Sequence, residues 1–176
     1  MNAKVKRTAL LGMITSVALV LAYLEAILPP ISTAVPGIKM GLPNLAIIFA
    51  LYRFGFKEAA TVSALRLFIV ALLFGNVMTL AYSVAGAVLS LAIMVILKRT
   101  DKFSSVGVSV AGAVMHNLGQ ILVAVFLFET VQLGYYMIIL SVTGSIAGVL
   151  IGVGAGILLR RTEKLKIQPI GSPDDC

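Results

Sequence analysis

Six long apolar runs, separated by short polar connections, occupy almost the whole of this sequence. A helix that crosses a bilayer needs about 20 predominantly apolar residues, and five of the six runs reach or approach that length. Short connections place consecutive helices side by side and antiparallel. We therefore predict an all-α membrane protein, a compact bundle of six transmembrane helices, with spans at about residues 8–28, 40–52, 57–74, 77–97, 106–128 and 132–159.

The composition agrees with a membrane protein. Of 176 residues, 60% are hydrophobic and 12% are charged, whereas a globular domain has about 45–50% apolar and about 25% charged residues. We assign residues 1–162 to one transmembrane domain and residues 163–176 to a flexible cytoplasmic tail. The net charge of +7 sits mainly at the ends of apolar runs. This placement favours anionic lipid headgroups as the partner and argues against nucleic acid.

The basic residues also predict an orientation. With six crossings and a cytoplasmic N-terminus, 12 of the 14 lysines and arginines fall in cytoplasmic segments, which places both termini inside. The basic stretch Asn2–Arg7 before the first run could instead begin a secretion signal. We keep the run as the first span, because it is longer than a signal core and Ala22–Ala26 is a poor cleavage site.

Two stripes of small residues predict close helix packing. Gly144, Gly148, Gly152 and Gly156 repeat at intervals of four in the last run, and Ala18, Ala22 and Ala26 repeat in the same way in the first. Small residues on one face let a neighbouring backbone approach closely, which drives helix association in lipid. The alanine stripe has two interpretations, packing inside the bundle or docking onto a partner membrane protein.

Several polar side chains lie inside the apolar runs and require an explanation. A charge at the bilayer centre costs about 2.5–3.5 kcal/mol, so Arg66 must be paired or must face a cavity. His116 and Gln120 share one helix face, with Asn117 on its flank, and we read this cluster as the wall of a polar cavity. Arg66 either contacts a ligand there, or belongs to an internal network in which it pairs with Glu25 or caps backbone carbonyls. His116 is the sole histidine, so a multi-histidine metal site cannot form.

The second run is too short for an ordinary span. Because proline favours the first helical turn, we predict that its helix begins at about Leu42–Asn44, although a start at Ile38 remains the alternative. The helix would then cover about half a bilayer. Its positive N-terminal end, with Lys39 beside it, would open at membrane depth, where it suits anionic groups.

Three motifs resemble a known bacterial membrane family. These are the string from Pro36 to Asn44, Arg66 with the later Leu72–Gly75, and His116–Gln120. They resemble the Gx transporter family, which is also labelled heptaprenyl diphosphate synthase component I. The likeness runs from about Lys6 to Arg161. Pro43 departs from the alanine of the family pattern, which strengthens the case for a broken helix there.

The resemblance implies a fold and partners. The family is similar to the substrate-binding S components of energy-coupling factor (ECF) transporters, which are six-helix proteins that dock onto a transmembrane coupling subunit with ATPase subunits. It implies a bacterial cytoplasmic membrane location, docking through Ala18, Ala22 and Ala26 as an exposed strip, and a substrate near the outer face. With the cluster above, the candidate substrate contacts are Lys39, Asn44, Arg66, Asn76, Tyr82, His116, Asn117, Gln120 and Tyr135.

The sequence argues against catalysis by this chain alone. Prenyl diphosphate chemistry uses carboxylate clusters that hold Mg²⁺, but the three aspartates are Asp101 in a connection and Asp174 and Asp175 in the tail. No nucleophile triad or phosphate-binding loop is present. We expect no enzyme activity, no cofactor and no metal. The expected function is S-component-like capture of a small anionic, vitamin- or cofactor-like nutrient. Two alternatives are a non-catalytic membrane partner in isoprenoid, quinone or flavin-linked metabolism and a structural membrane subunit.

Overall fold

The computed structural model describes residues 3–27, 41–74, 77–129 and 135–164, and within them the chain forms six α-helices. Their bounds lie within a few residues of the six apolar runs, except that the first helix begins five residues before the predicted start and the last helix continues five residues beyond the predicted end. The helices are α1 (Ala3–Ile27), α2 (Leu42–Arg53), α3 (Phe56–Phe74), α4 (Val77–Arg99), α5 (Ser105–Phe128) and α6 (Tyr136–Lys164).

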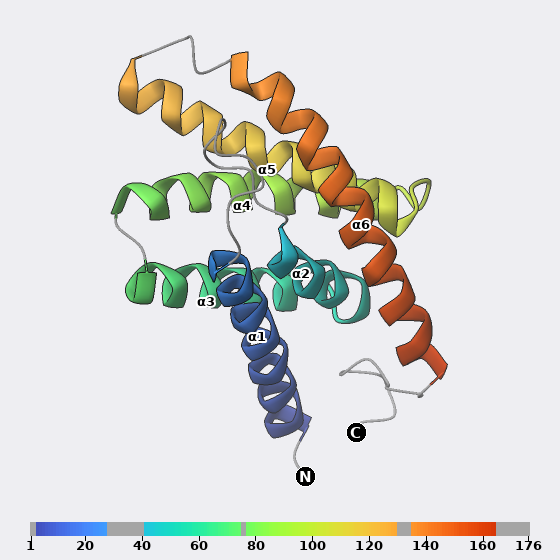
Figure 1. The fold of residues 1–176 in the computed structure, drawn as a ribbon. Coiled ribbons are helices and arrows are strands. Elements are labelled where there is room, and N and C mark those ends of the chain that lie inside the picture. The colour runs from blue at the N-terminus through green and yellow to red at the C-terminus, as the bar shows by residue number, and fades with distance from the viewer. Residues whose placement is uncertain (1–2, 28–40, 75–76, 130–134, 165–176) are drawn as a thin grey trace.

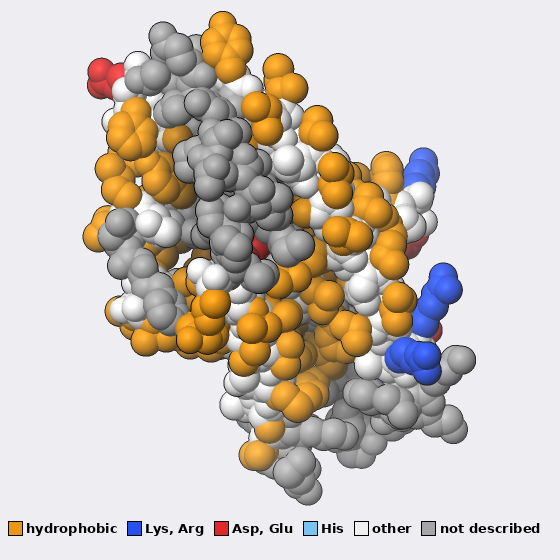
Figure 2. All heavy atoms as spheres, in the orientation of Figure 1, with side chains coloured by type: hydrophobic (Ala, Val, Ile, Leu, Met, Phe, Trp, Pro, Cys, Tyr) orange, Lys and Arg blue, Asp and Glu red, His pale blue; other side chains and the backbone are white. Residues whose placement is uncertain are grey.

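Four of these helices are long and apolar enough to cross a membrane. The qualifying segments lie in α1, α4, α5 and α6, among the residues that the structure describes. Helix α3 has 19 residues but carries Lys57, Glu58 and Arg66. Helix α2 has 12 residues and extends for about 18 Å, little more than half of the hydrocarbon thickness. The all-helical fold is confirmed. The four long apolar helices indicate that the chain is a membrane protein. Figure 2 shows hydrophobic side chains spread over the visible face, with the lysines and arginines toward one edge.

The helices close into a ring. Helix α1 contacts α2 and α3, α3 contacts α4, α4 contacts α5, α5 contacts α6, and α6 returns to α2. In Figure 1 the beginning of α1 and the end of α6 both lie toward the lower edge of the view. The short helix α2 is the most enclosed element: Ile48, Ala50 and Leu51 are at most 1% exposed. They join a core to which all six helices contribute.

The predicted packing role of the α6 glycines is confirmed. A Cβ atom added at Gly148 would lie 2.7 Å from the Cα of Val110, and one at Gly152 would lie 2.6 Å from the Cα of Val106. Both distances are to the backbone of α5. The two helices therefore approach so closely that only hydrogen fits between them at these positions. Gly119 of α5 lies equally close to Ala85 of α4, so α4, α5 and α6 form one tightly packed layer.

Helix α2 begins where the proline pattern predicts. Gly41 caps its N-terminus in the left-handed conformation (φ 72°), and Pro43 occupies the first turn. A left-handed residue cannot continue a helix toward the N-terminus, and glycine adopts this conformation without the steric cost of a Cβ atom. The predicted start at Leu42–Asn44 is therefore confirmed, and the alternative start at Ile38 is wrong. Lys39 lies outside the described residues.

Polar contacts tie the helices together at the end of the bundle where α1 begins. Arg7 of α1 forms an ion pair with Glu58 of α3. Lys98 of α4 donates a hydrogen bond of 2.6 Å to the carbonyl oxygen of Leu51 in α2, and its ammonium group lies 5.2 Å from the centre of the Tyr52 ring. These contacts join α1 to α3 and α2 to α4, which are pairs without a glycine stripe between them.

Candidate functional site

A cavity of about 710 Å³ lies inside the ring, and all six helices contribute to its wall. This volume falls within the range of about 300–1,000 Å³ that is typical of small-molecule sites. Most of the wall is aliphatic, and a limited set of polar side chains interrupts it. These polar residues are Tyr23, Glu25, Asn44, Arg66, Thr79, Ser83, Ser90, Ser109, His116, Asn117 and Gln120.

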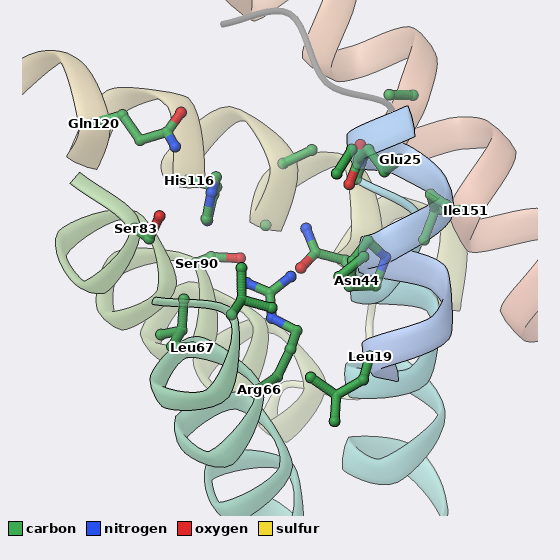
Figure 3. A pocket seen from close by; sticks show the side chains of 18 of the residues that line it. Leu19, Glu25, Asn44, Arg66, Leu67, Ser83, Ser90, His116, Gln120 and Ile151 are labelled. Atoms are coloured by element: carbon green, nitrogen blue, oxygen red, sulfur yellow. The ribbon is translucent and has the colours of Figure 1, made fainter. Parts of the chain in front are cut away.

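Arg66 is the one lysine or arginine among the described lining residues. Its side chain extends from α3 into the cavity, toward Asn44 and Ser90 in Figure 3. Its Nε atom is buried, and no hydrogen-bond partner for it lies within the described residues. A buried guanidinium donor without an acceptor is costly, because burial removes its water and nothing replaces it. The position is suited to an acidic group that enters the cavity.

Glu25 has a different partner from the one that the ion-pair alternative assigns to it. Its carboxylate accepts a hydrogen bond from the backbone N–H of Gly41, at the N-terminus of α2. The one ion pair within the described ranges is that of Arg7 with Glu58, so no direct pair joins Glu25 to Arg66. A carboxylate is stabilised at a helix N-terminus by the helix dipole.

The α2 N-terminus is therefore not the open anion site that we expected. Glu25 engages the N–H of Gly41, the N–H of Asn44 donates to the carbonyl oxygen of Gly41 at 2.8 Å, and Pro43 has no N–H. Few backbone donors remain for an external anion. The side chain of Asn44 does line the cavity. Among the described lining residues, Arg66 rather than the amides of α2 is therefore the group suited to a negative charge.

The α5 cluster lies on the cavity wall as predicted. His116, Asn117 and Gln120 all line the cavity, and Figure 3 shows His116 and Gln120 on the same stretch of α5. Asn117 also has a structural role, because its Nδ2 donates a hydrogen bond of 2.7 Å to the carbonyl oxygen of Leu140 in α6. His116 packs on Gly86 of α4, where a Cβ atom would lie 2.9 Å from the ring. These contacts fix the cluster in place.

The structure brings five of the nine predicted contact residues together and separates two. Asn44, Arg66, His116, Asn117 and Gln120 line one cavity. Tyr82 and Tyr135 do not belong to its wall, and Tyr135 is 76% exposed, so we remove both from the site. On this part of α4 the cavity is lined by Thr79, Leu80 and Ser83 instead of Tyr82. Lys39 and Asn76 lie outside the described residues.

Sequence reasoning missed the hydroxyl side chains of the wall. Thr79, Ser83 and Ser90 follow one face of α4 at intervals of four and seven residues, and Ser109 faces them from α5. Serine and threonine inside apolar helices are common enough that each alone carries little information. Their helical spacing was the available signal.

The alanine stripe of α1 is not one exposed strip. Ala18 is 0% exposed and belongs to the core, so the prediction is wrong at this position. Ala22 is partly buried and Ala26 is exposed, and both border the cavity. Docking through all three alanines is therefore inconsistent with the structure, whereas docking at the Ala26 end of the stripe stays a prediction.

Removing the carboxylate of Glu25 is expected to destabilise the fold. Glu25→Ala leaves the N–H of Gly41 without its acceptor and should lower the free energy of unfolding by about 1–3 kcal/mol; Glu25→Gln retains an acceptor and should cost less. Thermal unfolding of the purified protein measures both effects. Glu163→Ala, an exposed carboxylate in the last turn of α6, is the control and should change stability by less than about 0.5 kcal/mol. Equal effects of Glu25→Ala and Glu163→Ala would contradict the capping role.

The fold and the cavity define a class, a helical membrane protein whose helices surround a largely aliphatic cavity with several polar side chains, large enough for a small molecule. Comparison with protein families makes the assignment specific. The family described as heptaprenyl diphosphate synthase component I matches the chain over residues 14–158. The chain therefore belongs to this family, which is the one also labelled Gx transporter. No curated protein and no solved structure matches it.

Proposed function

We propose that this chain is the membrane-embedded substrate-binding subunit of an uptake system, of the S-component type, and that it captures a small anionic nutrient resembling a vitamin or cofactor. One observation carries the proposal: Arg66 extends into a cavity of about 710 Å³, and its buried Nε atom has no acceptor within the described residues. An acidic ligand would supply that acceptor as a charge-assisted hydrogen bond. The serine, histidine and amide side chains of the wall would orient its uncharged part.

Transport against a gradient would need partner subunits. The sequence contains no phosphate-binding loop, so the energy would come from ATPase subunits acting through a transmembrane coupling subunit. Since Ala18 is buried, that subunit would not dock along the whole alanine stripe of α1. The charge pattern supports six spans with both termini inside, and the family resemblance implies a bacterial cytoplasmic membrane location. In this arrangement α2 and α3 complete the wall of the chamber between the four long helices.

The alternative function is a non-catalytic membrane partner in isoprenoid, quinone or flavin-linked metabolism. The family description, which names a component of heptaprenyl diphosphate synthase, favours it. In this role the chain would hold a substrate or product for a separate catalytic subunit. Stable co-purification with a prenyl synthase, without binding of any water-soluble anion, would favour this alternative over uptake.

Ligand-dependent stability tests the proposal. The protein is purified in a neutral detergent, co-purified small acids are identified by mass spectrometry, and these acids together with a panel of vitamins and organic anions are tested by thermal unfolding. A ligand that binds only the native state adds about 2.7 kcal/mol at 100 times its Kd. We expect stabilisation by an anion and none by its neutral ester or amide. Failure of every anion to stabilise the protein would refute the proposal.

A further inference from the structure

A second hollow lies on the outside of the bundle, between α3 and α4. It is a groove of about 410 Å³, and its wall is almost wholly apolar. The wall consists of Ala60, Ser63, Ala64, Leu67, Phe68, Leu80, Val84, Ala87, Val88 and Leu91. Phe68 and Val88 are 60% and 61% exposed, so the groove is open toward the surroundings of the bundle. In a membrane protein these surroundings are lipid chains.

The groove and the polar cavity share a wall. Leu67 of α3 and Leu80 of α4 line both hollows. Leu67 directly follows Arg66 in the chain, and Figure 3 shows the two side chains on neighbouring positions of α3. Arg66, the cation in the cavity, is therefore adjacent in the chain to Leu67, which forms part of the wall between the cavity and the groove.

The wall between the cavity and the groove can open at the interface between α3 and α4. The α4–α5 and α5–α6 seams are closed by glycines at backbone contact distance, whereas two leucine side chains form the shared wall between α3 and α4. Leucine side chains change rotamer with little movement of the backbone, while helices in backbone contact cannot separate without losing their packing. Rotation of Leu67 and Leu80 would join the polar cavity to the apolar groove.

We propose that the ligand is a single-chain amphiphile, with its acidic head at Arg66 and its hydrocarbon chain passing between Leu67 and Leu80 into the α3–α4 groove. The proposal rests on the proposed function, because it uses the same cavity and the same arginine. The arrangement leaves no polar group of the ligand in lipid and no apolar chain in water. It also provides a lateral route, by which the head enters the cavity while the chain stays in the bilayer.

A photoreactive fatty acid tests this placement. The protein is reconstituted in phosphatidylcholine nanodiscs with hexadecanoic acid that carries a diazirine at the end of its chain, and cross-linked residues are mapped by mass spectrometry. We expect labels on the groove residues of α3 and α4. An excess of unlabelled hexadecanoic acid should displace the probe, whereas hexadecanol of equal length should not, because it lacks the charge.

Filling the groove should remove chain binding without affecting the head site. Val88→Trp places a large ring in the groove from its exposed side, away from the core. We expect labelling to fall at least about tenfold, which corresponds to about 1.4 kcal/mol of lost chain binding. Val142→Trp is the matched control, because Val142 is 58% exposed on α6 and does not line the groove, and it should leave labelling unchanged.

The outcomes separate this inference from the proposed function. If butanoate and hexadecanoate, each corrected for partition into empty nanodiscs, bind equally well and both depend on Arg66, the amphiphile is refuted and the anion site stands. Labels spread evenly over all lipid-facing helices would likewise refute it. If Val88→Trp releases a co-purifying membrane protein and leaves labelling unchanged, the groove is a protein-docking surface and the inference is wrong. If no anion of any length binds, the proposed function fails as well.

Discussion

Gly152→Val is expected to destabilise the protein strongly, by separating α5 from α6. Even the first carbon of the new side chain would lie 2.6 Å from the Cα of Val106 and 2.9 Å from the Cβ of Ser109. A backbone atom cannot move aside by a rotamer change, so the two helices must shift, and overpacking of this kind costs about 1–3 kcal/mol or more. Thermal unfolding or denaturant titration of the purified protein should show the loss.

A matched glycine provides the control for this prediction. Gly12 of α1 is also helical, but a Cβ atom added there would meet nothing within 4 Å. Gly12→Ala should leave stability unchanged or raise it by up to about 1 kcal/mol, because alanine is the better helix former. Gly152→Ala should still be destabilising, since the clash begins at the Cβ atom. If the two alanine variants behave alike, close approach of α5 and α6 does not stabilise the bundle.

Arg66→Ala is expected to abolish binding of any anion that stabilises the wild-type protein. Removing one partner of a buried charge contact costs about 2–5 kcal/mol, so the Kd should rise by at least about 30-fold. The free energy of unfolding without ligand should stay the same or increase, because the variant no longer buries a cation whose Nε has no acceptor. Calorimetry and thermal unfolding measure the two effects separately.

Two further variants sharpen the test of Arg66. Arg66→Lys keeps the positive charge but loses the planar donor pair, so binding should be weakened less than in the alanine variant. Leu65→Ala, at the neighbouring and 43% exposed position of α3 that does not line the cavity, is the control and should retain wild-type affinity. Strong destabilisation of ligand-free Arg66→Ala, with unchanged affinity for the anion, would assign Arg66 to a structural role and remove it from the site.

The positions of the helices and of their breaks follow from local properties of the chain. Long apolar runs predict the six helices, because each residue in lipid must satisfy its backbone hydrogen bonds within its own helix. The start of α2 at Leu42 follows from Gly41 and Pro43, and the close approach along α6 follows from Gly148 and Gly152. Each of these features depends on residues at most a few positions apart, so it can be predicted from the sequence alone.

The partners of the polar and small side chains could not be predicted in this way. A helical stripe such as Ala18, Ala22 and Ala26 identifies a face of α1 but contains no information about what that face meets. In the structure Ala18 packs in the core, and Ala22 and Ala26 border the cavity. The sequence suggested Arg66 as a partner for Glu25, and only the packing of α1 against the start of α2 assigns Glu25 to the N–H of Gly41 instead. Likewise, Leu67 and Leu80 are ordinary apolar residues in the sequence. They become the wall between a polar cavity and an apolar groove because α3 and α4 pack side by side, and contacts between helices depend on the three-dimensional arrangement rather than on periodicity.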